Sequence, residues 1–380
     1  MVRGHLLANF STLDLRPMLG FCESVPPVIA GNQPILTAAA SIRTVNSVYT
    51  EAPSTRPPSG RSRCCSWSRS IRNLASSRNL PIRTKLEYYA AVTVVTVLGA
   101  IPRGTALAVG RFVAWTTYHL SKRLRTIATH NLTLALPELQ PSEREQIVSG
   151  VFANLGRLLA EFCQLPKLTK QNVSERVIYD GYENFGRALE RGQGVLFLTA
   201  HYGAWELCPY AHALYGHPLK FVVRPIDNPL VDQLVNRYRM GSGNQVIEKR
   251  NSLKEILVTL KRGDAVGILI DQNTFREAGV FAPFFNIPAC TTTSLATIAL
   301  RTGAAIVPGV LIWNKHLRKH QLRFEPQVEL VETGNKQQDI LTNTTRCNQV
   351  LEELVRKHPD QWLWVHRRWK TRPEGEEELY

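Results

Sequence analysis

Cysteine patterns that mark a disulfide framework or a zinc site are missing from this 380-residue chain. The seven cysteines are odd in number and widely scattered, and no CxxC pair or Cys/His cluster with zinc spacing occurs among them. They are Cys22, Cys64, Cys65, Cys163, Cys208, Cys290 and Cys347. We therefore expect free thiols in a reducing compartment and no bound metal.

Lysine is absent from the beginning of the chain, where the first one is Lys85. Residues 1–80 contain nine arginines and three acidic residues, a balance of +6, so +9 of the total charge of +15 lies in residues 81–380. The Ser-, Arg- and Pro-rich stretch 51–70 has no helical or strand period. We expect residues 1–82 to be a disordered leader or an over-extended start of the reading frame. The basic remainder favours anionic partners: phospholipid head groups, acidic proteins, phosphorylated substrates or nucleic acid.

No hydrophobic run reaches the roughly 20 apolar residues that a membrane-spanning helix takes. Tyr88–Ile101 is an uncharged apolar run of 14 residues, and a second apolar stretch, Ala106–Leu120, follows a break at residues 102–104. Residues 83–120 therefore form either a short or interfacial membrane anchor or two buried core helices. The basic cluster SKRLR at 121–125 suits anionic lipid head groups and favours an N-terminal membrane-anchoring helix.

Residues 121–373 have the pattern of one α/β domain, and residues 374–380 form an acidic tail. A helix is predicted from Ser142 as N-cap to about Phe162, with apolar residues at helical spacing. Short apolar runs then alternate with helical segments. These runs are 194–200, 219–224, 265–271 and 304–313. Such alternation predicts a mostly parallel central sheet flanked by helices on both faces.

Polar side chains follow three of the predicted strands. His201 and Glu206 come after the first strand, Arg224 ends the second, and Asp271 and Gln272 end the third. Because ligands of open α/β sheets gather at the carboxyl ends of the strands, we expect a binding site there.

His201 and Glu206 are the candidates for acid–base chemistry. Imidazole titrates near neutrality and can accept a proton from a hydroxyl, while a neighbouring carboxylate fixes its tautomer. Gly203 supplies the backbone freedom that such a turn needs. The alternative is a histidine that caps a helix and a glutamate paired with a surface cation. A zinc site would need further ligands, and no second histidine lies four residues along.

Several segments, in order, resemble the bacterial lipid A biosynthesis acyltransferases, the late lauroyl/myristoyl group. Each segment is weak alone, but the ordered set is specific and extends from about Lys85 to Pro373. Two positions depart from the family pattern, namely Ala204, where Asn is common, and Asn286, where Gly is common. The segments are NLTLALPEL (131–139), NLGRLLAEF (154–162), LTAHYGAWEL (198–207) with its HX4(D/E) pattern, VVRPIDNPLVDQLVNRYRMGSGNQVI (222–247), GILIDQN (267–273), 280–309 and WLWVHRRWKTRP (362–373).

The resemblance implies a glycerolipid acyltransferase-like fold and transfer of a fatty acyl chain to a hydroxyl of a lipid A precursor or similar glycolipid. The donor would be an acyl-carrier-protein or CoA thioester. The enzyme would act at the cytoplasmic face of the inner membrane. The resemblance implies no cofactor, metal or nucleic acid. His201 would deprotonate the hydroxyl, and Glu206 would orient and charge-balance His201. Backbone N–H groups just after His201, or a nearby arginine, would hold the oxyanion.

The resemblance also gives roles to residues outside this pair. Substrate-binding candidates are Arg224, Arg239, Asp271, Gln272 and Arg367, with Asp271 and Gln272 either binding sugar hydroxyls or supporting His201. Their alternatives are solvated helix charges and helix caps. Residues 281–285, FAPFF, either line the acyl channel or belong to the core. The tryptophans and arginines of 362–369 suit a membrane-interface belt or an acidic carrier protein, or else a buried strand.

Two other functions stay open at this point. One is an acyltransferase for another lipid, such as a phosphatidylinositol mannoside, an ornithine lipid or a lysophospholipid. The other is a basic membrane- or nucleic-acid-binding protein without turnover, which would bind in a salt-sensitive way that does not depend on His201.

Overall fold

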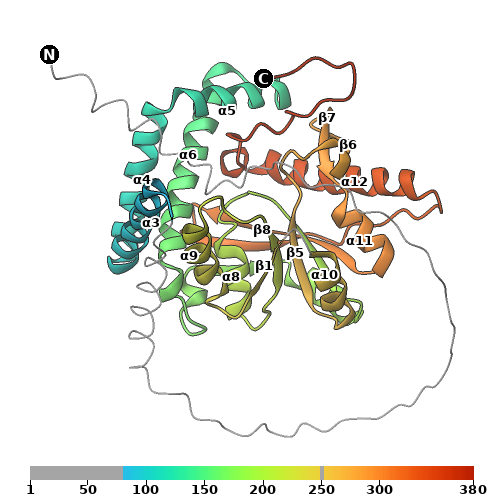
Figure 1. Ribbon diagram of the computed structural model, residues 1–380, viewed down its shortest axis with the longest axis horizontal. Coiled ribbons are helices and arrows are strands. Elements are labelled where there is room, and N and C mark those ends of the chain that lie inside the picture. Colours follow the sequence, from blue (N-terminus) through green and yellow to red (C-terminus); the bar gives the residue numbers. More distant parts are fainter. Residues whose placement is uncertain (1–79, 249–251) are drawn as a thin grey trace, which may run out of the picture.

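A computed structural model describes residues 80–248 and 252–380 (Figure 1). The predicted leader, 1–82, lies almost wholly outside these residues. The helices are α3 (Ile82–Ala100), α4 (Arg103–Leu120), α5 (Lys122–Ala135), α6 (Pro141–Cys163), α7 (Tyr182–Glu190), α8 (Leu207–Leu214), α9 (Pro229–Met240), α10 (Ser252–Lys261), α11 (Ser294–Thr302) and α12 (Lys336–Lys357). The strands are β1 (Val177–Asp180), β2 (Val195–Thr199), β3 (Lys220–Val223), β4 (Gln245–Glu248), β5 (Ala265–Leu269), β6 (Gly279–Phe284), β7 (Ile287–Thr292), β8 (Ala305–Asn314) and β9 (Lys319–Phe324).

A seven-stranded sheet in the order β1-β9-β8-β2-β5-β3-β4 forms the centre of the domain. Its neighbours pair in parallel, except that β8 and β9 are antiparallel. The four predicted apolar runs are β2, β3, β5 and β8, so the mostly parallel sheet is confirmed. Strands β1, β4 and β9 and the separate hairpin β6–β7 were not predicted, because they are short or alternate in burial.

Helices cover both faces of the sheet, as predicted (Figure 1). On one face, Leu198 and Ile268 pack with side chains of α10, α11 and α12. On the other face, Phe197 and Phe221 pack with side chains of α6, α7, α8 and α9. Burial on both faces explains why β2 and β5 are continuous apolar runs rather than alternating ones.

Helix α6 begins two residues earlier than a Ser142 N-cap would allow. Its N-cap is Gln140, followed by Pro141, and the Glu143 side chain accepts from the Gln140 backbone N–H at 2.7 Å in a capping box. The prediction of Ser142 as the cap was therefore wrong. Pro141 is well placed at the first helical position, because a residue there has no helical partner for its N–H.

The apolar segments at 83–120 form α3 and α4, which pack on the domain (Figure 1). Helix α3 contacts α6 and α9, and α4 crosses α6. Within residues 80–248 and 252–380, no helix is both long enough and apolar enough to cross a membrane. Both helices nevertheless expose large apolar side chains to solvent. These are Ile82, Leu86, Tyr89, Val94 and Val97 on α3, and Val109, Phe112, Val113, Trp115 and Leu120 on α4.

Small residues allow α4 and α6 to cross at very short range. A Cβ atom built on Gly156 would overlap the carbonyl oxygen of Gly110, and one on Gly110 would overlap Gly156. Two turns before Gly110, Arg103 at the start of α4 donates through Nε to the buried Glu161 carboxylate at 3.1 Å. Burial alone would raise the pKa of Glu161, but hydrogen bonds and charges from His320 and Arg103 outweigh it and hold that pKa at about 2.

We predict that Gly156→Leu separates α4 from α6 and lowers the free energy of unfolding by about 3 kcal/mol, because an inserted side chain has no room at the crossing. Chemical denaturation followed by circular dichroism measures this. Gly104→Ala is the matched control, since nothing lies within 4 Å of a Cβ atom there, and it should unfold like the parent chain. Equal stability of Gly156→Leu and the parent would contradict the close crossing.

Candidate functional site

The predicted strand-end residues, except the buried Asp271, line a cavity of about 630 Å³ at the carboxyl edge of the sheet. His201, Glu206, Arg224, Arg239 and Gln272 all line it. Most of the remaining lining is apolar and comes from β2, β3, β5, α4, α6 and α8. The strand ends therefore come together as the sequence predicted, and the largely apolar cavity at this edge suits a hydrocarbon chain.

Gly203 fixes the turn that presents His201. Its φ is +60°, and a Cβ atom on it would overlap the carbonyl oxygen of Leu311 on β8. The Gly203 N–H donates to the Gln361 carbonyl at 2.9 Å, and the Ala204 N–H donates to Leu311 at 2.8 Å. This position needs glycine for both its left-handed conformation and its lack of a side chain.

Asp271 holds His201 through both of its carboxylate oxygens. Oδ1 lies 2.9 Å from the ring Nδ1, and Oδ2 accepts from the His201 backbone N–H at 2.9 Å. Oδ2 also accepts from the indole N–H of Trp362 at 2.9 Å. Burial alone would raise the pKa of Asp271, but the charge and hydrogen bonds of His201 and the Trp362 bond outweigh it and lower that pKa. Asp271 is therefore an anion at neutral pH.

The two partners of the His201 ring are consistent with one tautomer. Asp271 is an acceptor only, so the Nδ1 that faces it carries the proton. On the other side, the Gln272 amide nitrogen, which can only donate, lies 3.3 Å from Nε2. Nε2 therefore keeps its lone pair, and His201 itself lines the cavity. In its neutral form, a ring held this way can take a proton from a bound hydroxyl.

Glu206 lies at the same cavity, but its hydrogen-bond partner is Arg239. Arg239 Nε and Nη2 donate to the two carboxylate oxygens at 2.8 and 2.6 Å, a bidentate pair. Burial alone would raise the pKa of Glu206, but Arg239 and the nearby charge of His201 lower it. The structure thus gives the orienting contact with the His201 ring to Asp271, which was expected either to bind sugar hydroxyls or to support His201, and not to Glu206.

Arg239 and Arg224 differ in how far their donors are used. Arg239 is mostly buried and engaged with Glu206. Arg224 makes one long contact, 3.4 Å, from Nη2 to Asp227 on the surface. Among the described residues, none accepts a hydrogen bond from its buried Nη1. Arg224 is therefore the cavity arginine whose Nη1 has no acceptor among the described residues.

Arg367 does not line the cavity; its guanidinium lies over the Tyr380 ring, 5.6 Å from the ring centre. Its neighbour Arg368 is fully buried instead and donates to the Cys290 carbonyl at 3.0 Å and the Gln272 carbonyl at 3.3 Å. Trp362 and Trp364, like Trp369, are also buried. The interpretation of 362–369 as a membrane-interface belt is therefore wrong, because these side chains form core.

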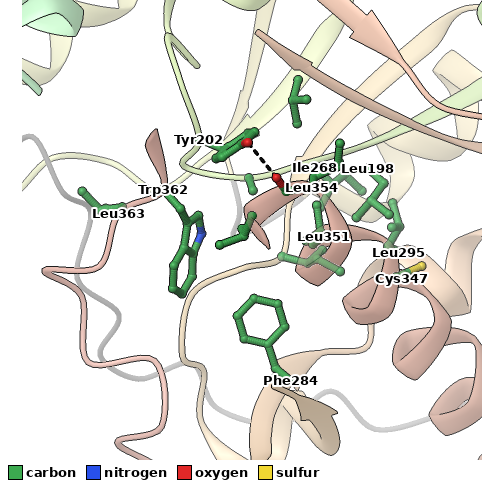
Figure 2. Packing of buried hydrophobic residues seen from close by; sticks show 14 of the residues in the cluster. Leu198, Tyr202, Ile268, Phe284, Leu295, Cys347, Leu351, Leu354, Trp362 and Leu363 are labelled. Carbon is green, nitrogen blue, oxygen red and sulfur yellow. Dashed lines mark hydrogen bonds between the residues drawn. The ribbon is translucent and has the colours of Figure 1, made fainter. Parts of the chain in front are cut away.

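Trp362 was missed as a site residue. It lies 91 positions from Asp271 in the sequence, and no local pattern connects the two. Figure 2 shows its indole among buried side chains, with Phe284 and Leu363 close by. Asn131 of α5 also holds this segment, because its side-chain amide donates to the Trp364 and His366 carbonyls at 2.6 and 2.7 Å.

The FAPFF segment belongs to the core rather than to the cavity. Phe284 is buried and packs on Trp362 (Figure 2). Phe285 is also buried and packs on Trp364. Phe285 and Asn286 form the two-residue turn between β6 and β7, with φ of +53° and +62°. Asn tolerates this left-handed conformation, so the departure from Gly at 286 is compatible with the turn.

Most backbone amides just after His201 are already used. The N–H groups of residues 201–204 donate to Asp271, Ala200, Gln361 and Leu311, and those of 207 and 208 donate to Ala204. These six amides are therefore not open for an oxyanion, and the expectation stays a prediction for the N–H groups of Trp205 and Glu206 alone. Arg224 and the Gln272 amide are donors that line the cavity instead.

Comparisons with known proteins identify the family of this chain. A family model described as bacterial lipid A biosynthesis acyltransferase matches residues 77–371. The chain is 32% identical over 260 residues to the lipid A biosynthesis palmitoleoyltransferase of Escherichia coli (strain K12), covering 68% of this chain and 83% of that protein. It is 30% identical over 255 residues to the lipid A biosynthesis lauroyltransferase of the same organism, covering 67% and 81%. The corresponding myristoyltransferase is 26% identical over 272 residues, covering 71% and 81%. The chain belongs to the bacterial lipid A biosynthesis acyltransferases, and it is an acyltransferase.

Proposed function

We propose that this protein transfers a fatty acyl chain from an acyl-carrier-protein thioester to a hydroxyl of a lipid A precursor at the inner membrane, with His201 as general base. The observation that carries this proposal is the His201 ring, held through Nδ1 by the buried Asp271 carboxylate, at the wall of a largely apolar cavity. A thioester and a hydroxyl need only proton transfer and oxyanion stabilisation to react.

The reaction begins when Nε2 of His201 takes the proton of the acceptor hydroxyl. The oxygen attacks the thioester carbonyl carbon, and the electrons of the C=O bond move to the oxygen as an oxyanion. When the tetrahedral intermediate collapses, the carbon–sulfur bond breaks, and the leaving thiolate takes the proton back from His201. An ester and a free thiol result, and His201 returns to its neutral form.

Asp271 acts here as a positioning residue that fixes the tautomer and stabilises the imidazolium. Glu206, the carboxylate of the HX4(D/E) motif, adds a second negative charge near His201, and Arg239 holds it in the ionised form. Arg224 binds a phosphate of the acceptor or the oxyanion through its unused Nη1. Acyl-CoA is the other donor that fits this chemistry.

Helices α3 and α4 support a location at the membrane surface. Ten large apolar side chains of these helices are exposed, with Phe112 at 65% and Trp115 at 59%. Residues 82–135 contain seven basic residues and one acidic residue, Glu87, which suits anionic lipid. Val113 is both exposed and part of the cavity wall. We infer that α3 and α4 lie in the lipid interface, so that a lipid acceptor reaches His201 without leaving the membrane surface.

We predict that His201→Ala lowers kcat for acyl transfer on the order of a thousandfold, because no group remains to take the hydroxyl proton. The assay supplies acyl carrier protein or CoA loaded with acyl chains of graded length, and mass spectrometry follows the lipid A precursor. His316→Ala, which changes an exposed histidine, should keep the parent rate. If the wild-type protein binds lipid without any turnover, and His201→Ala binds lipid equally well, the protein is a binding protein and not an enzyme.

We also predict that Phe112→Ser combined with Trp115→Ser lowers binding to phosphatidylglycerol vesicles by about tenfold or more, since two apolar anchors are lost. Vesicle flotation measures the bound fraction, and binding should weaken with salt and with zwitterionic lipid. Leu317→Ser is the control, because Leu317 is 51% exposed but lies outside α3 and α4. Identical flotation of the double variant and the control would exclude this surface as the membrane contact.

A further inference from the structure

We infer that Gly267 on β5 sets the longest acyl chain that this enzyme accepts, by leaving open one lobe of the cavity between the sheet and α8. The inference rests on the proposed acyl transfer and names the part of the site that selects the donor. It follows from which strand residues line the cavity and from what a side chain at each glycine would meet.

The lobe lies on the sheet face that carries Phe197 and Phe221. Gly267 pairs with both of these residues across β2 and β3, and all three line the cavity. Leu196 and Leu198, the alternate residues of β2, belong to the core on the opposite face. Cys208, Pro209 and His212 of α8 also line the cavity and form the roof of the lobe over this face.

The strand register gives the lobe a direction. Thr199 and Leu269 pair at the end of β2 and β5, next to His201, and both line the cavity. Phe197 and Gly267 pair two residues further in, which is about 7 Å deeper along the strands. A chain whose carbonyl reacts at His201 would therefore pass Leu269 before it reaches Gly267.

The lobe suits an alkyl chain because the described side chains that we assign to it carry no fixed charge. From the strands these are Phe197, Phe221, Leu269, Leu322 and Phe324, and Leu219 lies just before β3. The polar member of the roof is His212, whose Nδ1 is bonded to the Tyr179 hydroxyl at 2.8 Å. Burial, and to a smaller extent the neighbouring His217, lower the pKa of His212 to about 3, so it is neutral.

Gly267 is the position where a side chain would occupy the lobe without moving the backbone. A Cβ atom there would lie 3.5 Å from the Phe221 Cβ and 3.7 Å from Leu219 Cδ1, which are ordinary contacts. At Gly309 on β8, a Cβ atom would lie 3.2 Å from a Phe324 ring carbon and 3.3 Å from a Phe197 ring carbon, which is tighter. Since β-strands accept alanine, valine and leucine, Gly267 can be replaced by a graded series.

The test compares kcat/KM for acyl donors of increasing chain length in wild type, Gly267→Ala, Gly267→Val and Gly267→Leu. Each methylene that loses its place in the cavity costs about fourfold in binding. The preferred length should shorten stepwise with side-chain size. In Gly267→Leu, the preference for the longest wild-type donor over one four carbons shorter should fall on the order of a hundredfold, while short donors keep their rate. Gly186→Ala on α7, where a Cβ atom meets only Tyr182 at 3.9 Å, is the control and should keep the wild-type length profile.

A second readout separates this inference from the proposed function. Binding of free fatty acids of graded length, measured by calorimetry on the same variants, does not require turnover. A shorter length limit in the Gly267 series supports the lobe even if no acyl transfer is found, in which case only the proposed function fails. An equal loss for all lengths in folded Gly267→Ala, or a length limit that does not move in Gly267→Leu, overturns the inference.

Discussion

The buried carboxylate of Asp271 is the interaction on which the site depends. It accepts hydrogen bonds from the ring and the backbone of His201 and from the indole of Trp362, so one anion joins β2, β5 and the C-terminal segment. An isolated carboxylate in this position would be costly to bury, but three donors offset that cost and keep it ionised. The ring that it holds is thereby fixed in position and tautomer before any substrate arrives.

The surroundings of the Asp271 carboxylate suit a lipid substrate. Helix α4 can expose Phe112 and Trp115 while its inner side forms the cavity wall, because glycines at 110 and 156 bring it close to α6. On the sheet, the missing side chain at Gly267 keeps the cavity open beyond the reacting centre. An apolar outer surface, an open wall and a deep lobe together suit reactants that carry hydrocarbon chains.

The sequence was sufficient for four of the seven strands of the central sheet and for five polar residues of the cavity wall, namely His201, Glu206, Arg224, Arg239 and Gln272. Strands β2, β3, β5 and β8 are continuous apolar runs, and the carboxyl ends of parallel strands meet at one edge, so His201, Arg224 and Asp271 could be placed together. The pairing of Asp271 with His201 and of Glu206 with Arg239 could not be predicted. Both carboxylates follow strands that end at the same edge, and the sequence does not show which of them contacts the His201 ring. The segment that contains Trp362 is buried by contacts from α5, β6 and α12 that no local pattern encodes. For this reason a membrane-interface belt, a contact with an acidic carrier protein and a buried strand all stayed open for 362–369.

The state of the His201 ring tests the central claim most directly. Nitrogen-15 NMR of the imidazole, recorded where the ring is neutral, should show its proton on Nδ1, and Asp271→Asn should weaken this preference while Glu206→Gln leaves it in place. The Asn variant keeps the shape of the site but offers an amide that can donate, so the preference for protonated Nδ1 weakens. A wild-type ring protonated on Nε2, or a tautomer that follows Glu206 rather than Asp271, would contradict the account.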